Sequence, residues 1–201
     1  MRTSDLEPTD DPDSRLMVRV RDGDPEAFAL LFEKHSAAVA RFATNFTGAR
    51  ARGEELAQEV FLQVYRARAR YEPRAKFSTW LYTIAHNLCL NEVRRFDYRG
   101  RFESLERDDP GAEAPRSLEL ADPAALDGET AVGVEELAAR LRVLVAALPE
   151  SQRAALVLSR VDELRYQEIG EVLGCSEQAV KSLIFRATKA LREGLRGYVG
   201  A

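Results

Sequence analysis

Apolar residues recur at helical spacing through the first part of the chain, and turn signals divide that part into separate helices. Residues 1–12 are polar, acidic and interrupted by proline, and we expect them to be disordered. A short helix is predicted next, and it ends within residues 22–25. There Gly23 suits a helix end, Asp24 suits the N-terminal cap of the following helix, and Pro25 suits its first position.

The second helix is predicted to reach about Phe46, with Gly48 and Gly53 bracketing a break before the third helix. The third helix starts near Glu54, runs to about Arg70 and carries a wide apolar stripe on its inner face. Residues at i, i+3, i+4 and i+7 share its other face: Glu55, Gln58, Glu59 and Leu62. A solvated face explains this set, although an apolar leucine among acids and an amide is also what a partner helix engages.

The stretch 76–95 is predicted to form one helix with two unlike surfaces. Ser78 or Thr79 can cap its start, because a short hydroxyl satisfies an unpaired helix N–H group. Its inner positions carry Leu81, Ile84 and Leu88. Aromatics, then amides and cations, follow in the order Phe77, Trp80, Tyr82, Asn87, Asn91, Arg94 and Arg95. Such groups stack on unpaired bases, contact base edges and hold phosphates, but an aromatic-rich core helix with a solvated basic end also explains them.

The helical pattern fails from Gly100 to about Gly133. Prolines and glycines punctuate this acidic, alanine-rich segment, and we expect residues 101–133 to be a flexible linker. A linker of this length lets the modules on either side of it bind distant sites on one target. The chain is therefore predicted to contain two modules, at residues 13–100 and 134–198.

The second module carries a helix-turn-helix pattern. Two helices, separated at Pro149, precede a short helix that ends at Gly174, where a left-handed turn costs glycine little. Ser176 caps a longer helix that runs to about Arg196. Val180, Ile184, Ala187 and Leu191 face inward, which leaves outward Lys181, Ser182, Phe185, Arg186 and Lys189. Cations and a hydroxyl on this face suit docking in a DNA major groove, and an ordinary helical hairpin with a basic face is the alternative.

Charge is segregated along the chain, although the formal net charge is only −4. Basic residues crowd positions 66–101, acidic residues dominate positions 103–136, and the final helix is basic again. Hydrophobic residues make up 45% of the chain, which is enough to bury a sizeable core. The pattern indicates two basic modules joined by an acidic connector, an arrangement typical of nucleic-acid binding.

The sequence offers little for metal or enzyme chemistry. Its 2 Cys and 2 His residues cannot build a disulfide framework or a standard Cys/His zinc site. His86 and Cys89 superficially suggest a metal pair, but packing or hydrogen bonding explains them more simply, and no phosphate-binding glycine loop or nucleophile elbow is present. No signal segment is visible, and no apolar run approaches the roughly 20 residues that cross a bilayer. We expect a cytoplasmic protein that is not an enzyme and needs no metal, cofactor or small-molecule substrate.

Four stretches together resemble the extracytoplasmic-function (ECF) class of bacterial RNA polymerase sigma factors. They are Asp24-Pro25-Glu26-Ala27-Phe28 with Leu31-Phe32; residues 55–62; residues 77–87 with Asn91 and Arg94-Arg95; and Leu148-Pro149 followed by the helix-turn-helix. Each stretch is degenerate alone, but their order and their separation by an acidic linker are specific. The resemblance covers about residues 14–100 and 134–197.

The resemblance implies an all-α protein of two small helical domains, each with its own target. The first domain, family region two, would dock on the clamp helices of the largest subunit of core RNA polymerase through Glu55, Gln58, Glu59 and Leu62. It would also melt and read the −10 promoter element, at positions that match Tyr71, Lys76, Trp80, Tyr82, Asn87, Asn91, Arg94 and Arg95. The second domain, family region four, would read the duplex −35 element through Ser176, Gln178, Lys181, Ser182, Phe185, Arg186 and Lys189.

Two departures from the family pattern concern reach and geometry rather than charge. Glu55 stands where aspartate is frequent, and Lys181 stands where arginine is common, so bidentate guanine recognition is lost there. The family also leads us to expect control by a separate anti-sigma protein, which could hold the chain at the membrane. A conventional duplex-binding regulator and a purely helical adaptor are the rival interpretations. The first leaves the N-terminal module without a role, and the second leaves the recognition face unexplained.

Overall fold

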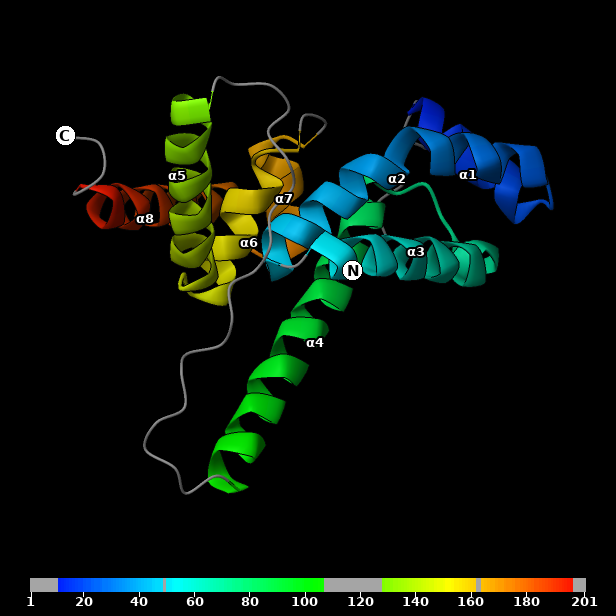
Figure 1. Ribbon diagram of the computed structural model, residues 1–201. Helices are drawn as coiled ribbons and strands as arrows, with labels where there is room; N and C mark the ends of the chain where they lie inside the picture. Colours follow the sequence, from blue (N-terminus) through cyan, green and yellow to red (C-terminus); the bar gives the residue numbers. More distant parts are fainter. Residues whose placement is uncertain (1–10, 49, 107–127, 162–163, 197–201) are drawn as a thin grey trace.

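The computed structural model describes residues 11–48, 50–106, 128–161 and 164–196. Every regular element in these ranges is a helix, as predicted (Figure 1). The first domain consists of α1 (Pro12–Arg21), α2 (Pro25–Thr47), α3 (Arg50–Ala67), the short 3-10 turn η1 (Arg68–Arg70) and α4 (Phe77–Glu106). The second consists of α5 (Gly128–Ala146), α6 (Glu150–Leu158), α7 (Tyr166–Leu173) and α8 (Glu177–Leu195).

The turn between α1 and α2 confirms the sequence prediction. Gly23 has a φ of 101°, and Asp24 accepts hydrogen bonds from the backbone N–H groups of Glu26 and Ala27 at 2.9 and 3.2 Å. At the other end of α1, the chain is ordered earlier than we expected. Asp11 caps that helix by accepting a hydrogen bond of 3.0 Å from the Ser14 N–H, so the prediction of disorder fails at residues 11 and 12, and residues 1–10 lie outside the described residues.

The predicted break at Gly53 is wrong. Gly48 does end α2 in the left-handed region, with a φ of 82°, but Gly53 lies buried inside α3. A Cβ atom at Gly53 would lie 2.8 Å from the backbone nitrogen of Thr44 and 3.0 Å from the carbonyl oxygen of Ala40, both on α2. The glycine therefore allows two helices to cross at close range, a role that local sequence signals do not distinguish from a turn.

The linker is shorter than the pattern predicted, because helices extend into both of its ends. The helix that begins at Phe77 continues to Glu106, and α5 starts at Gly128. The rest of the predicted linker, residues 107–127, lies outside the described residues. In Figure 1 the second half of α4 projects away from both domains.

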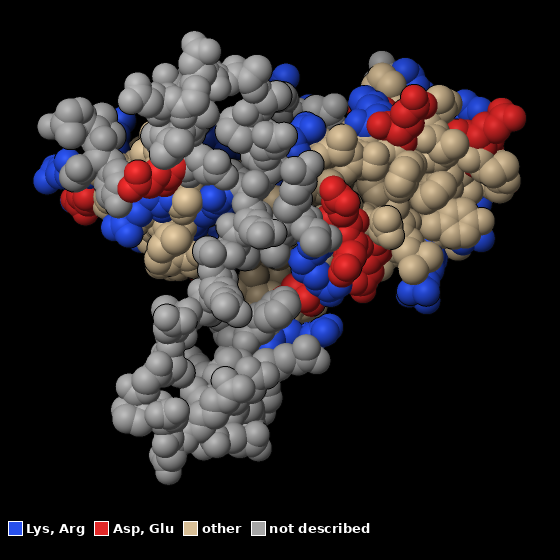
Figure 2. All heavy atoms as spheres, in the orientation of Figure 1, with Lys and Arg blue, Asp and Glu red and all other residues tan. Residues whose placement is uncertain are grey.

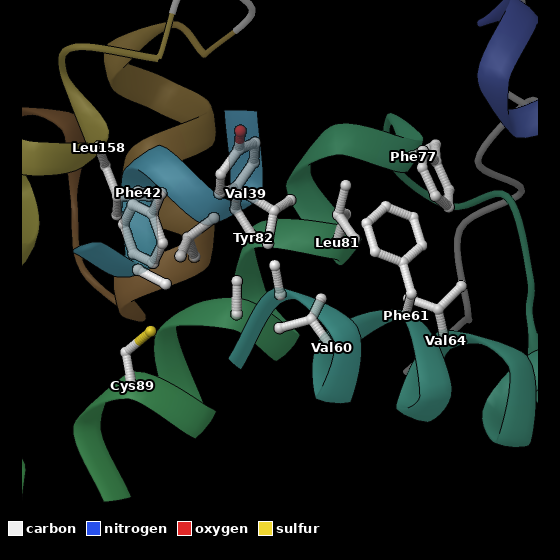
Figure 3. Packing of buried hydrophobic residues seen from close by; sticks show 14 of the residues in the cluster. Val39, Phe42, Val60, Phe61, Val64, Phe77, Leu81, Tyr82, Cys89 and Leu158 are labelled. Carbon is white, nitrogen blue, oxygen red and sulfur yellow. The ribbon is translucent and has the colours of Figure 1, made fainter. Parts of the chain in front are cut away.

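One apolar core runs through the first domain and into the second. Buried residues from α1 to α4 include Met17, Leu31, Phe42, Val60 and Leu81, and they share a continuous cluster with Val157, Leu158 and Ile169. Figure 3 shows Leu158 of α6 close to Phe42 of α2. The two predicted modules therefore form two packed domains in this structure. No helix in the described ranges is long and apolar enough to span a membrane.

Gly53→Ala is expected to destabilise the protein by about 1–3 kcal/mol, because the added methyl group overpacks the crossing of α2 and α3. Elsewhere in a helix the same substitution is usually stabilising, by about 1 kcal/mol or less. The sign of the change in urea unfolding, followed by circular dichroism, is therefore the test. An unchanged or raised midpoint would contradict the close approach.

Candidate nucleic-acid interface

The helix-turn-helix of the second domain has the predicted geometry. Gly174 ends α7 with a φ of 65°, and the Ser176 hydroxyl oxygen accepts a hydrogen bond of 3.2 Å from the Ala179 N–H, which caps α8. Gly170 lies against the turn, since a Cβ atom there would be 2.6 Å from the carbonyl oxygen of Cys175. The turn thus closes tightly on α7 and fixes the direction in which α8 leaves it.

The two faces of α8 separate as its sequence pattern predicts. Val180 and Ala187 are fully buried, and Ile184 and Leu191 pack partly buried beside them. The predicted contact residues lie outward, and Phe185 is 70% exposed. Ser182 is half-buried, and its hydroxyl donates to the carbonyl oxygen of Gln178 at 3.0 Å. The exposed residues of the set are Ser176, Gln178, Lys181, Phe185, Arg186 and Lys189.

Acidic partners neutralise part of this face. Lys181 forms an ion pair of 2.6 Å with Glu177, and Lys189 approaches Glu193 at 4.0 Å. Both pairs are exposed, so each is worth about 0–1 kcal/mol and is easily exchanged for another anion. Arg186 forms no ion pair with the described residues, which leaves its guanidinium available to a ligand.

The outer face of α3 combines acids with apolar surface. Glu55, Gln58 and Glu59 are exposed, and Leu62 beside them keeps 46% of its surface exposed. Arg52 holds Glu55 on one side and reaches Glu92 of α4 at 2.7 Å on the other. On the face in Figure 2, acidic side chains stand beside an uncharged surface over α2 and α3.

This apolar surface is wider than the sequence predicted. Tyr65, one turn beyond Leu62, is exposed, and its ring lies 5.2 Å from that of Phe28. Phe32 of α2 is also exposed, and its ring packs at 4.9 Å from that of Phe61. An aromatic ring that is half covered by its neighbours leaves its other face accessible to a partner. The periodicity of the sequence alone does not show which rings are exposed in this way.

The predicted −10 residues divide into a buried group and an exposed group. Tyr71 is only 3% exposed, and its hydroxyl donates to the Ser14 hydroxyl at 3.0 Å. Tyr82 is buried against Phe42, with ring centroids 5.5 Å apart. Both tyrosines pack behind the surface here, so direct contact of either with DNA stays a prediction. Trp80 and Lys76 are half-buried, and the exposed members lie further along α4, at Asn87, Asn91, Arg94 and Arg95.

The start of α4 is held by a residue that sequence reasoning missed. Asp11 accepts a hydrogen bond of 2.9 Å from the backbone N–H of Phe77, as well as the Ser14 hydroxyl at 2.8 Å. The predicted caps, Ser78 and Thr79, instead lie buried within the first turn. One carboxylate thereby caps α1 and α4 together. Through Ser14 it also fixes Tyr71, whose ring packs edge-on against Trp80 at 4.9 Å.

Two acids of the second domain contact the basic surface of α4. Lys76 lies 2.7 Å from an oxygen of Glu168 on α7, and Arg94 forms two hydrogen bonds with Glu150 at the start of α6, at 2.9 and 3.3 Å. The bond from Arg94 lowers the pKa of Glu150, and the same bond raises the pKa of Arg94. Neither acid carries a sequence signal that points to α4, because the partners lie far apart along the chain.

Cys89 and both histidines pack within the first domain. Cys89 is buried, and burial raises the pKa of its thiol to about 12, which keeps it protonated at neutral pH. Burial lowers the pKa of His86. His35 lies 2.8 Å from Asp13 in the interior of the first domain. Within the described residues no group of three or more His, Cys, Asp or Glu side chains could hold a metal ion.

Comparison with known families assigns both domains to one class of transcription initiation factor. The family model described as Sigma-70 region 2 matches residues 31–98, and that described as Sigma-70, region 4 matches residues 138–191. Both matches lie within the two predicted modules. They define a sigma factor of the sigma-70 type.

Relatives along the whole chain narrow this assignment. The chain is 33% identical over 183 residues to the ECF RNA polymerase sigma factor SigW of Bacillus subtilis, covering 89% of this chain and 94% of SigW. It is 30% identical over 192 residues to the RNA polymerase sigma-H factor of Pseudomonas aeruginosa, covering 94% and 96% of the two chains. The chain belongs to the ECF class of RNA polymerase sigma factors, which direct promoter-dependent initiation of transcription.

Solved structures share the fold. The structure of CnrH in complex with the cytosolic domain of CnrY aligns with a TM-score of 0.67 at 23% identity, over 93% of this chain and 99% of that one. The sigma factor RpoE in complex with the anti-sigma factor NepR from Bartonella quintana aligns with a TM-score of 0.62 at 22% identity, over 87% and 98%. At this level of identity the likeness concerns the arrangement of helices.

Asp11→Ala is expected to lower the free energy of unfolding by about 2 kcal/mol, because one helix cap is worth about 0.5–2 kcal/mol and Asp11 serves two helices. Asp11→Asn keeps a side-chain acceptor and should lose less. Burial opposes ionisation of Asp11, but the hydrogen bonds from Phe77 and Ser14 outweigh it and lower its pKa from 3.8.

The contribution of the Asp11 carboxylate is therefore complete above pH 3.8 and is lost as pH falls through the lowered pKa of the folded state. Urea unfolding of wild type and Asp11→Ala between neutral pH and strong acid measures this difference. A stability gap that stays constant into acid would contradict the role of the carboxylate.

Proposed function

We propose that this chain docks on core RNA polymerase through the outer face of α3 and directs it to promoters by reading a −10 element with α4 and a −35 element with α8. The observation that carries the proposal is the presence of two different exposed surfaces on one chain. An acidic and apolar face lies on the first domain, and a cationic helix-turn-helix face lies on the second. A duplex-binding regulator alone has no use for the first surface.

The face on α3 has the chemistry of a protein-docking site. Leu62 and Tyr65 expose apolar surface to water, which is unfavourable, and Glu55 and Glu59 place negative charge beside that surface. A partner helix with apolar anchors and basic flanking residues complements such a face, because buried apolar area supplies affinity and opposite charge supplies orientation. The clamp helices of the polymerase largest subunit are the proposed partner.

The surface of α4 is suited to a single DNA strand. Asn87 and Asn91 are exposed one turn apart, where their amides can hydrogen-bond base edges. Trp80 is half-buried, so one part of its ring is available for stacking while the rest is held by Tyr71 and Phe77. Arg95 is exposed, and its guanidinium lies 3.7 Å from a carboxylate oxygen of Glu92. A base removed from the duplex needs such stacking and hydrogen-bonding groups.

The face of α8 is suited to duplex DNA. Arg186 can hold a guanine with two parallel hydrogen bonds, whereas Lys181 supplies a point charge without that geometry. Phe185 projects from the same face and can contact a thymine methyl group. The protein should therefore read part of the −35 element through bases and hold the rest through phosphates.

Control by an anti-sigma protein is part of the proposal. CnrH and the sigma factor RpoE, which share this fold, were both solved in complexes, with the cytosolic domain of CnrY and with the anti-sigma factor NepR. For this chain we infer a comparable protein partner. Its site of action would be the cytoplasm, where the polymerase and the promoter are found.

Run-off transcription with purified bacterial core polymerase, on a library of promoter fragments, tests the whole proposal. Specific transcripts are expected only when the protein is present, and their start sites would define both promoter elements. The variant Glu59→Lys with Gln58→Ala should lose both co-elution with core polymerase and transcription, because it reverses charge on the docking face. Its circular dichroism should be unchanged. Unaltered affinity of the variant for polymerase would refute this docking face.

Arg186→Ala is expected to weaken binding to a promoter fragment that carries the −35 element by about 1–3 kcal/mol, if the guanidinium contacts a base. The loss should be confined to one position of the element, as shown by fragments mutated base by base. Arg192→Ala removes the same charge near the end of α8 and serves as the control. A loss that is equal on all sequences, with a salt slope reduced by about one, would show a phosphate contact instead.

A further inference from the structure

The interface between the two domains reaches part of the surface proposed to hold the −10 strand. The second domain places α7 against α4, and α6 against α2. Lys76 and Arg94, the two cations of the predicted −10 set that lie nearest the second domain's acids, are each engaged by a carboxylate of that domain, as described above. The docking face on α3 and the outer face of α8 both remain exposed. Domain packing therefore engages two cations of one proposed functional surface and leaves the other two surfaces open.

Both carboxylates are held in position by their own domain. One oxygen of Glu168 accepts a hydrogen bond of 2.7 Å from the Arg165 N–H, at the start of α7, and the other contacts Lys76. Glu150 lies in the first turn of α6, where a negative charge is favoured by the helix dipole. Both oxygens of Glu150 bond to Arg94, which is the geometry that a guanidinium also uses for phosphate.

A buried arginine ties the same domains together. Arg153 of α6 donates to the carbonyl oxygens of Phe46 on α2, at 3.4 Å, and of Leu148 within its own domain, at 3.3 Å. Its guanidinium also lies 5.8 Å from the centre of the Phe46 ring. The carbonyl of Phe46 belongs to the last turn of α2, where helix carbonyls lack partners within the helix. The second domain thus satisfies a group of the first.

The interface is nevertheless incompletely packed. A cavity of about 260 Å³ lies at the boundary, between α2 and the end of α6, and residues of both domains line it, among them Arg41, Tyr82 and Arg160. The cavity is open to solvent, so water reaches between the domains there. The side chains of Arg94, Glu150 and Lys76 are partly exposed, and Lys76 lies beside a largely covered Glu168, so solvent and salt weaken both ion pairs. An interface of this kind can separate at a modest cost in free energy.

We propose that Glu150 and Glu168 act as intramolecular competitors of promoter DNA. In the free protein they occupy Lys76 and Arg94, the cations that otherwise bind phosphates of the −10 strand, and the domains must separate before the strand can reach these two cations. Because the docking face stays open in the closed state, polymerase can engage the protein before DNA does. The inference rests on the proposed function of α4 as the −10 surface.

The test uses the full chain with both acids neutralised, as Glu150→Gln with Glu168→Gln. The probe is a fluorescein-labelled single-stranded oligonucleotide of mixed sequence, and its affinity for the free protein is measured by anisotropy at low salt. We expect the double variant to bind about 2- to 30-fold more tightly than wild type, since two ion pairs between the domains are lost. Small-angle X-ray scattering should show a larger radius of gyration.

A matched control separates the release of α4 from a general change of charge. Glu26→Gln with Glu33→Gln removes two exposed carboxylates from the N-terminal half of α2, neither of which pairs with Lys76 or Arg94. An equal gain in affinity in this control would overturn the proposal, and so would an unchanged affinity or an expanded variant that binds the oligonucleotide no better. If the wild type gives specific transcripts and any of these results is also found, the proposed competition by Glu150 and Glu168 is rejected while the promoter function stands. Absence of transcripts, with tighter binding and expansion, would reject the promoter function while supporting the masked cations.

Discussion

Burial of the inner face of α4 is the constraint on which the rest of the structure depends. Leu81, Tyr82 and Cys89 lie in the interior between α2 and α3, and α7 covers a further part of the helix from the second domain (Figure 3). With 3.6 residues per turn, fixing these positions leaves Asn87 and Asn91 facing solvent. The polar surface and the core are thus two sides of one helix, and neither can rotate without the other.

The axial position of α4 depends on a different interaction. The Asp11 carboxylate receives the N–H of Phe77, although 66 residues separate the two along the chain. The same carboxylate caps the N-terminus of α1, so it links α1 to the start of α4, where Trp80 lies. A negative group at the first turn of a helix also interacts favourably with the positive end of the helix dipole. The aromatic head of α4 is therefore positioned by residues at the far end of the domain.

Charge explains why the domains lie where they do. A formal net charge of −4 conceals a basic surface on α4 and acids at the starts of α6 and α7, and these meet in the folded protein. Ion pairs such as these fix the relative orientation of the two domains but add little to the free energy of their association, and salt weakens them. Affinity between the domains comes from apolar contacts around Leu158 and from the buried guanidinium of Arg153. The arrangement is specific in geometry and modest in strength.

Local sequence patterns determined the helices, the turn at residues 22–25, the helix-turn-helix and the exposed face of α8, because each is set by neighbours within a few residues. The four resembling stretches also determined the family. Tertiary structure decided the rest. It buried Tyr71 and Tyr82, placed Gly53 at a helix crossing, gave the cap of α4 to Asp11 and set Glu150 on Arg94, 56 residues away. Such pairs repeat no period and adjoin no turn, so only packing of the whole chain brings them together.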